Sequence, residues 1–304
     1  MTKIESKPGI NSKLLSAVLK QIKSRPSLGS IGVEQYRVLL EKSAAMFKLD
    51  KTVVCEHVIL DSIPGAFLIP HGLKSKRVIL YLHGGGFIAG SINSHRDLAT
   101  RIAKASNAKL LLLDYRLAPE HKFPAGLYDA LNAYKWLLNR NISPENIILA
   151  GDSAGGGLAL SLAMLIKDKG LAMPGCAVFL SPWVDLECRG KSHLRNKDKD
   201  PMLTDDMLYS TIKFYTDNQD LSHPLLSPIN GDFSGLCPML IQAGSCEVLE
   251  DDAVMLAEKA QQAGIEAELE IWDGMFHVWQ YFSRYLFQGR EAVEKIGSFI
   301  RSHC

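Results

Sequence analysis

Short apolar runs that are continuous rather than alternating constrain the fold of this chain more than any other feature. They lie at residues 78–82, 108–113, 147–150, 177–180 and 239–243, with a more alternating run at 267–272. A strand with only apolar side chains needs cover on both faces of its sheet, which is the usual setting of parallel strands. Segments with helical spacing lie between these runs, at 98–105, 125–138, 157–167, 251–263 and 289–301. The pattern predicts an α/β fold with a mostly parallel central sheet and helices on both faces.

Two parts of the chain do not follow this alternation. Residues 11–47 predict two amphipathic helices, the first ending at Arg25-Pro26. Residues 188–235 contain a polar stretch and one candidate helix at 205–215. No linker rich in Pro, Gly or Ser divides the chain. We therefore expect residues 1–304 to form one domain, with these two parts added near one end of the sheet.

Charge, hydropathy and cysteine content exclude several classes of function. The 34 Lys+Arg nearly balance the 33 Asp+Glu, which argues against a nucleic-acid partner, because phosphate binding needs clustered positive charge. No apolar run is long enough to span a membrane, and the first residues do not resemble a signal peptide. The six cysteines have no spacing typical of metal ligands or of a disulfide framework. We expect a cytoplasmic protein without stable membrane insertion, with no metal and no cofactor.

A serine follows the apolar run at 147–150 in the segment Gly151-Asp152-Ser153-Ala154-Gly155. The pattern Gly-x-Ser-x-Gly between a strand and a helix is typical of a sharp turn that exposes a nucleophilic hydroxyl. Small flanking residues are needed there, because strand and helix pass too close for larger side chains. The alternative is that Ser153 caps the helix that follows it.

A glycine-rich segment, His83-Gly84-Gly85-Gly86-Phe87, follows the apolar run at 78–82. Three consecutive glycines are costly in backbone entropy, but they allow N–H groups to approach a reacting atom. The spacing does not fit a phosphate-binding loop. A glycine-rich loop upstream of Gly-x-Ser-x-Gly is the arrangement expected for acyl-transfer chemistry.

Several further motifs occur in the same order as in one known family. With the two segments above, the sequence closely resembles the hormone-sensitive-lipase-like α/β-hydrolase carboxylesterases. The matching segments are His83 to Phe87, Asp114 to His121, Phe123-Pro124-Ala125, Gly151 to Gly156, Ser181-Pro182-Trp183 and Gly274 to His277. The resemblance covers roughly residues 75–300 and implies an α/β-hydrolase core with a helical cap, built from about 1–48 and 188–225.

The resemblance also implies roles for individual residues. It makes Ser153 the nucleophile and the N–H groups of Gly85, Gly86 and Ala154 the oxyanion hole. It makes His83 a structural residue that orders the glycine-rich loop. It leaves a homodimer open, because members of the family often pair through the last strand or the cap.

The order Ser, acid, His along an α/β-hydrolase chain places the general base after Ser153. Of the four histidines there, His193 and His223 fall in the proposed cap and His303 lies at the terminus. His277 follows the run at 267–272, where a loop at the edge of the sheet can reach the serine. We therefore expect His277 to be the base, although an ordinary loop histidine is the alternative.

The carboxylate that orients this histidine is expected after the run at 239–243. The family pattern Asp-x-Leu-x-Asp-Asp/Glu aligns with residues 247–252, and Glu247 stands where Asp is usual. Glutamate can fix the imidazole tautomer as aspartate does. We assign Glu247 and keep Asp251 as the second candidate, with a first-turn helix acid as its alternative role.

The predicted function is hydrolysis of small uncharged esters through an acyl-enzyme intermediate, and the family resemblance implies short to medium acyl chains. One alternative is an amidase of arylformamidase or arylacetamide type. The other is a ligand-binding receptor on the same fold, which the apparent presence of Ser153, His277 and an acid argues against. Candidates for the pocket wall, each of which could equally be core, are Leu14, Leu15, Val18, Phe87, Trp183, Met202, Leu203, Leu208 and Tyr209.

Overall fold

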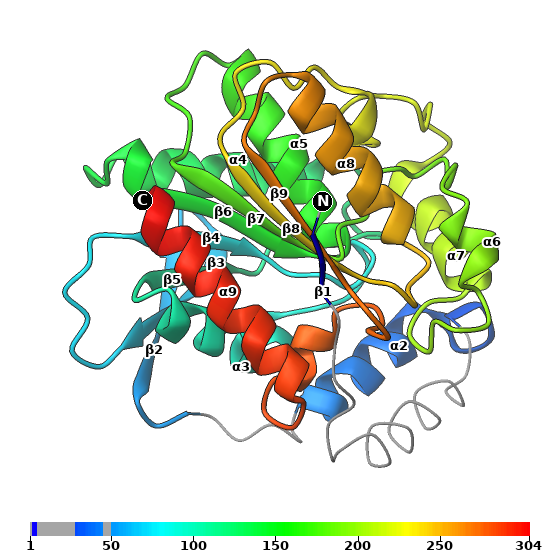
Figure 1. Ribbon diagram of the computed structural model, residues 1–304, viewed down its shortest axis with the longest axis horizontal. Helices are drawn as coiled ribbons and strands as arrows, with labels where there is room; N and C mark the ends of the chain where they lie inside the picture. The colour runs from blue at the N-terminus through cyan, green and yellow to red at the C-terminus, as the bar shows by residue number, and fades with distance from the viewer. Residues whose placement is uncertain (1, 5–27, 45–49) are drawn as a thin grey trace.

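The computed structural model describes residues 2–4, 28–44 and 50–304, and these form a nine-stranded sheet flanked by helices (Figure 1). The strand order is β1-β9-β8-β7-β6-β4-β5-β3-β2. All neighbours from β1 to β5 pair in parallel, whereas β3 and β2 are antiparallel to their neighbours. The strands are β1 Thr2–Ile4, β2 Val53–Leu60, β3 Ile63–Pro70, β4 Val78–Leu82, β5 Lys109–Leu113, β6 Ile147–Asp152, β7 Cys176–Leu180, β8 Met239–Gly244 and β9 Ala267–Trp272.

The side chains of β4 explain why the central strands have no polar face. Leu80 and Leu82 pack in the apolar core on one face of the sheet, and Ile79 and Tyr81 pack in a second core on the other. Successive side chains of a strand point to opposite faces, so a strand covered on both sides must be apolar throughout. The predicted α/β fold with a mostly parallel sheet is confirmed.

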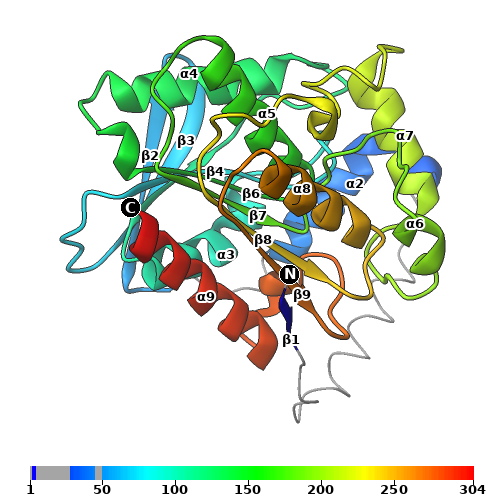
Figure 2. The same cartoon turned by 45° about the horizontal axis from the view of Figure 1, so that its top comes forward.

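Two layers of helices supply this cover (Figures 1 and 2). The first core receives α4 (Ala125–Leu138), α5 (Ala154–Asp168) and α8 (Glu250–Gln262). The second receives α3 (Ile92–Ala105) and α9 (Phe287–His303). Because β4, β6, β7, β8 and β9 run parallel, their carboxyl ends and the turns that follow them gather at one edge of the sheet.

Two strands, β2 and β3, and the start of helix α3 differ from what the sequence predicted. The strands β2 and β3 were not predicted, because β2 is an edge strand with mostly exposed, partly polar side chains. Helix α3 begins at Ile92, six residues before the expected start at Leu98. Its first turns look polar in sequence, yet Ser94 and His95 are buried. A capping box between Ser91 and Ser94 defines the start of the helix.

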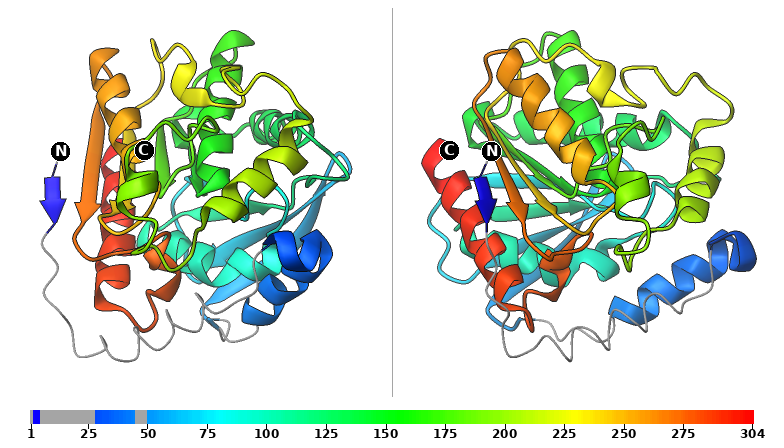
Figure 3. Two further views of the ribbon diagram at one scale, coloured as in Figure 1. Left: turned by 90° about the vertical axis from the view of Figure 1, so that its right-hand side faces the viewer. Right: turned by 45° about the vertical axis from the view of Figure 1, so that its right-hand side comes forward.

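The elements expected to form a cap lie only partly where the sequence placed them. Helix α2 (Leu28–Ala44) packs against α7 (Asp205–Thr216), and Figure 3 shows the two side by side, away from α9. The short helix α6 (Ser192–Arg195) precedes α7. The expected helix near 11–25 lies outside the described residues. At the start of the expected cap range of about 1–48, Thr2–Ile4 pair with β9 as a sheet strand.

Within the described part of the chain, no helix combines the length and the apolar character needed to cross a membrane. The remaining short helices are single 3-10 turns at Pro144–Asn146, Pro228–Asn230 and Trp279–Phe282.

Candidate active site

Ser153 lies on the tight turn between β6 and α5. Its φ of 55° and ψ of −125° belong to a region that residues with a Cβ rarely adopt, so the turn is strained. The backbone N–H of Ser153 donates to Leu180 O at 2.9 Å, which holds the turn against the end of β7. The hydroxyl makes no capping hydrogen bond to α5, so the alternative of a capping serine is wrong.

The glycines around Ser153 are required by close packing. A Cβ on Gly155 would lie 2.1 Å from Leu82 O, and one on Gly157 would lie 2.0 Å from Trp183 O. Both distances are shorter than any real contact between these atoms. The start of α5 therefore passes against the ends of β4 and β7, and this close approach presents the Ser153 hydroxyl above the sheet.

Three predicted side chains meet at this turn although they lie far apart in the sequence. The Ser153 Oγ is 2.9 Å from His277 Nε2, and His277 Nδ1 is 2.7 Å from Glu247 Oε2. Their exposed fractions are 8% for Ser153, 4% for His277 and 0% for Glu247. Each follows a different parallel strand, namely β6, β9 and β8, so the topology of the sheet brings them together.

Two opposing effects, burial and the neighbouring Glu247, determine the pKa of His277. Burial alone would lower the pKa, but the hydrogen bond and the negative charge of Glu247 outweigh it and raise the pKa above 6.5. Asp200 and Asp152 add to the same effect through their charges. The site therefore stabilises an imidazolium at His277, which is the form produced when the imidazole accepts a proton.

The glycine-rich loop follows β4 and begins directly beside the Ser153 turn, since a Cβ on Gly84 would lie 3.1 Å from Ser153 Cβ. Gly85 and Gly86 have φ of 115° and 64°, which favours glycine, and both line the cavity. A Cβ on Gly84 would lie 2.3 Å from Asp152 Oδ2. His83 stacks on Tyr115 at a ring separation of 4.4 Å and its Nδ1 lies 2.9 Å from Gly84 O. Burial, with the nearby charge of His95, lowers the pKa of His83 to about 3, so His83 is neutral.

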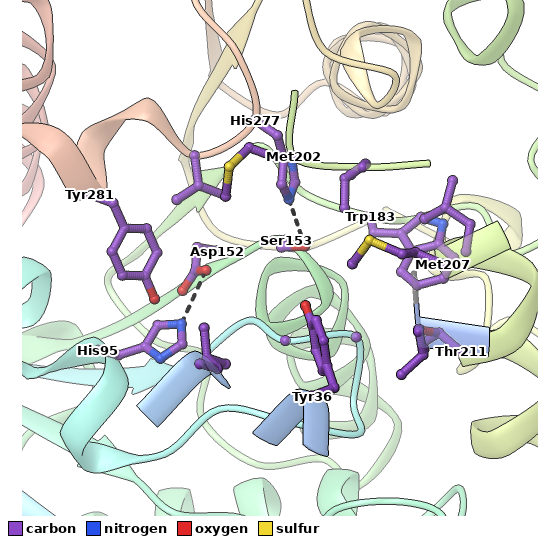
Figure 4. Close-up of a pocket in the computed structure, with 17 residues that line it drawn as sticks. Tyr36, His95, Asp152, Ser153, Trp183, Met202, Met207, Thr211, His277 and Tyr281 are labelled. Atoms are coloured by element: carbon purple, nitrogen blue, oxygen red, sulfur yellow. Dashed lines mark hydrogen bonds and ion pairs between the residues drawn. The ribbon is translucent and has the colours of Figure 1, made fainter. Parts of the chain in front are cut away.

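A cavity of about 110 Å³ opens onto Ser153 and His277 (Figure 4). Its apolar wall comes mainly from Trp183 and from the segment that includes α7, whereas His95, Asp152 and Tyr281 lie on the opposite side in Figure 4. The lining residues are Leu28, Tyr36, Leu40, Gly85, Gly86, His95, Asp152, Ser153, Trp183, Met202, Leu203, Met207, Leu208, Thr211, His277, Val278 and Tyr281.

Comparison with known families decides the identity of the fold. A family model described as the alpha/beta hydrolase fold matches residues 79–281, which is more than half of the chain. The chain is an α/β hydrolase. The match spans the glycine-rich loop, the Ser153 turn and His277, so the family covers all three parts of the candidate site.

Several relatives of this α/β hydrolase are bacterial proteins named as esterases or acetyl-hydrolases. An acetyl-hydrolase from Streptomyces hygroscopicus is 44% identical over 74% of this chain and 76% of its own length. An esterase from Acinetobacter venetianus is 32% identical over 94% of both chains. The crystal structure of an esterase from the bacterial hormone-sensitive lipase family has a TM-score of 0.92 at 38% identity, covering 96% of this chain and 98% of its own. The resemblance to hormone-sensitive-lipase-like esterases is confirmed.

The second acid candidate of this α/β hydrolase does not reach the histidine. Asp251 lies in the first turn of α8 and accepts from Ser192 N at 2.9 Å and from Arg195 Nη2 at 2.7 Å. Its role is therefore to hold the α6 region, and Glu247 is the carboxylate in contact with His277. His193 and His223 also lie away from Ser153, since His193 faces Asp252 at 3.7 Å and His223 contacts Phe123.

The sequence did not predict that Ser181 contacts Glu247 in the candidate site of this α/β hydrolase. Its hydroxyl donates to Glu247 Oε1 at 3.0 Å and accepts from Val278 N at 3.0 Å. Gly244 N donates to the same carboxylate oxygen at 2.5 Å. These bonds fix both the acid and the residue after His277. The motif Ser181-Pro182-Trp183 signalled family membership, but not this contact.

Asp152, the residue before Ser153, anchors the glycine-rich loop. Its Oδ1 accepts from Tyr81 Oη at 2.8 Å and from Gly84 N at 3.1 Å, and its Oδ2 lies 3.4 Å from His95 Nε2. Burial would raise the pKa of Asp152, but His95 and Tyr81 outweigh it and lower the pKa. The carboxylate thereby couples the turn of Ser153 to the loop that carries Gly85.

The predicted pocket wall is partly correct. Trp183, Met202, Leu203 and Leu208 line the cavity. Phe87 stacks on Tyr215 instead, and Tyr209 is 65% exposed. Leu14, Leu15 and Val18 lie outside the described residues. Among the residues that the structure describes, no three His, Cys, Asp or Glu side chains are grouped as a metal site would need.

Proposed function

We propose that this α/β hydrolase is a serine carboxylesterase that cleaves short- to medium-chain acyl esters through an acyl-enzyme intermediate. One observation carries the proposal. Ser153 Oγ, His277 and Glu247 form a continuous chain of hydrogen bonds, 2.9 and 2.7 Å long, at the wall of a cavity. The relatives named esterase and acetyl-hydrolase support it. The first test is hydrolysis of p-nitrophenyl acetate by the purified chain, and an inert wild type would contradict the proposal.

In the first half of the reaction, Ser153 Oγ attacks the ester carbonyl carbon while His277 Nε2 takes the hydroxyl proton. Glu247 holds the tautomer in which Nε2 is free to accept, and its charge stabilises the imidazolium that forms. When the tetrahedral intermediate collapses, His277 returns the proton to the departing alkoxide, and an alcohol leaves. In the second half, water loses a proton to His277 Nε2 as it attacks the acyl carbon. When the second tetrahedral intermediate collapses, the bond from that carbon to Ser153 Oγ breaks, His277 returns the proton to Ser153 Oγ, and the carboxylic acid leaves.

We assign the oxyanion hole to the backbone N–H groups of Gly85, Gly86 and Ala154. Gly85 and Gly86 line the cavity, and Ala154 is the first residue of α5. Among the described residues, none of these three N–H groups has an acceptor. The N-terminus of α5 adds a positive partial charge. One such donor contributes about 3 kcal/mol to the stability of the transition state in comparable sites.

The small apolar cavity supports small uncharged esters as substrates. Its volume of about 110 Å³ is well below the 300 Å³ or more of typical drug-sized sites, and its walls at Trp183 and Leu208 are apolar. We expect kcat/KM for p-nitrophenyl acetate or butyrate to exceed that for the laurate by at least about tenfold, because a chain that overfills the cavity costs roughly 1–3 kcal/mol. A preference for laurate would contradict this. Measuring a matched p-nitroanilide alongside separates an esterase from an amidase.

The activity should fall on the acid side with a midpoint above pH 6.5. Only the neutral imidazole of His277 can accept the serine proton, and Glu247 raises the pKa of His277 above 6.5 despite burial. A raised pKa keeps His277 protonated to a higher pH, so the acid limb moves upward. The measurement is kcat/KM of the wild type between pH 4 and 9 at constant ionic strength. A midpoint at or below 6.5 would contradict the assignment of His277 as a base paired with Glu247.

We propose further that the enzyme is cytoplasmic and has no nucleic-acid partner. All six cysteines are free thiols, as a reducing compartment favours, and the net charge is only +1. Cell fractionation tests the location, and recovery in an exported fraction would contradict it.

Light scattering of the purified chain tests the homodimer that the resemblance leaves open.

A further inference from the structure

The loop that carries Glu247 is held in place by the insertion between β7 and β8. Three buried side chains of the segment 192–200 form hydrogen bonds with the backbone of Glu247 and of the residue that follows it. Asn196 Nδ2 donates to Glu247 O at 2.9 Å, Ser192 Oγ donates to Val248 O at 2.5 Å, and Asp200 Oδ2 accepts from Val248 N at 2.9 Å. The backbone around the acid therefore depends on the insertion for its partners.

Asp200 also holds part of the cavity wall. Its second oxygen, Oδ1, accepts from Met202 N at 2.8 Å and from Leu203 N at 3.2 Å. Met202 and Leu203 line the cavity, and Figure 4 shows Met202 near His277. One buried carboxylate, 2% exposed, thus bonds on one side to the residue after Glu247 and on the other to two residues of the cavity wall.

We propose that Asp200 is a positioning residue for ester hydrolysis, which fixes Glu247 against His277 and joins the acid loop to the wall that contacts substrate. This inference rests on the proposed function and adds a third carboxylate to the candidate site. The role is electrostatic as well as mechanical. Glu247 after β8, Asp152 at the end of β6 and Asp200 in the insertion all favour the imidazolium form of His277 through their charges.

The ionisation of Asp200 is consistent with this role. Burial raises the pKa of Asp200 to about 6, while the charge of His277 and the N–H groups of Met202 and Val248 favour the carboxylate. At neutral pH the side chain is therefore charged while it accepts hydrogen bonds from three backbone N–H groups. A buried charge is costly unless hydrogen bonds stabilise it. The three N–H groups that bond to Asp200 therefore favour one conformation of the segment.

The test is the variant Asp200→Asn, measured with p-nitrophenyl acetate beside the wild type. Asparagine keeps one acceptor oxygen but places an NH₂ group against a backbone N–H, so one side of the connection is lost. We expect kcat to fall roughly 10- to 100-fold with KM changed less than about threefold, because a small misplacement of the acid affects the chemical step. The acid limb of kcat/KM should move down by at least about half a pH unit, because His277 loses a neighbouring negative charge.

The control is Asp185→Asn, which removes another buried carboxylate that accepts from two backbone N–H groups, those of Glu187 and Arg189. We expect Asp185→Asn to lower Tm without moving the acid limb. If Asp200→Asn behaves in the same way, with wild-type kcat and an unmoved acid limb, the inference is overturned. An inert wild type would instead overturn the proposed function.

A second variant keeps the inference testable if Asp200→Asn does not fold. Asn196→Ala introduces no new polar group and removes the Nδ2 donor to Glu247 O, together with its bonds to Ser245 O and Glu250 Oε2. We expect it to lower kcat at least about fivefold at nearly constant KM, because the acid loop loses one of its three anchors. Wild-type kcat in Asn196→Ala would overturn the claim that the insertion positions the acid.

Discussion

Replacing Ser153 by alanine is expected to lower kcat for p-nitrophenyl acetate by at least about 10⁴-fold, because no other group can form the acyl-enzyme. The substitution removes one oxygen from a side chain that makes no structural capping bond, so the fold and Tm should change little. The strained φ of 55° is imposed by the packing of β6 and α5 rather than by the hydroxyl. Steady-state kinetics and thermal unfolding measure the two effects.

A matched control for this variant is Ser161→Ala in the same helix, α5. Ser161 is buried, and its hydroxyl donates to Leu225 O at 3.1 Å, away from the cavity. We expect Ser161→Ala to cost about 1 kcal/mol of unfolding free energy and to keep kcat within about threefold. Mass spectrometry adds a positive test, since a reactive phosphonate should label the wild type and Ser161→Ala at Ser153. Labelling at another serine, or full activity in Ser153→Ala, would show that the nucleophile is elsewhere.

Replacing Glu247 by glutamine is expected to lower kcat by about 10³- to 10⁴-fold. The amide has nearly the shape of the carboxylate but carries no charge, and an NH₂ group facing His277 Nδ1 would favour the wrong tautomer. The amide oxygen is held at the Oε1 position by Ser181 Oγ and Gly244 N, which donate there at 3.0 and 2.5 Å, and this leaves the NH₂ group facing His277. KM should change far less than kcat, because Glu247 is fully buried and does not line the cavity.

Asp251→Asn is the control that separates the two acid candidates. Asp251 pairs with Arg195 and accepts from Ser192 N, so its substitution should loosen the α6 region and leave kcat within about threefold. The opposite pattern, with near-wild-type kcat in Glu247→Gln and a hundredfold loss in Asp251→Asn, would make Asp251 the acid.

The fold was predictable where the apolar pattern of a segment matches its burial in the folded structure. Strands such as β4, apolar at every position because both faces are covered, stand out from the sequence. Strand β2 does not, because its apolar and polar residues follow no regular alternation and several apolar ones, such as Val54 and Ile59, are exposed at the sheet edge. Its pairing with β3 defines it as a strand. The start of α3 was missed because polarity suggested a loop, whereas His95 is buried by its ring contacts to His83 and Tyr281.

The candidate site shows the same division. Ser153, His277 and Glu247 follow strands, and the order of the motifs along the chain indicated them before any distance was known. Ser181 and Asp200 act through hydrogen bonds to residues 66 and 48 positions away. The motif Ser181-Pro182-Trp183 marked Ser181 as a family landmark but not as a partner of Glu247, and no motif marked Asp200. Their contribution depends on which distant residue the fold brings into contact.

The three-residue strand β1 has a consequence for assembly. It pairs in parallel with β9 opposite Glu270, Ile271 and Trp272, so it occupies the outer hydrogen-bonding groups at the carboxyl end of that strand. An uncovered edge strand is a template for a neighbouring chain. A second copy that extended the sheet across this boundary would first have to displace β1 or add to it, and three residues offer a short platform. In the described part of the chain, a copy that extended the sheet at this edge would therefore have to pair with β1 or with Ala267, Glu268 and Leu269 of β9, which β1 does not cover.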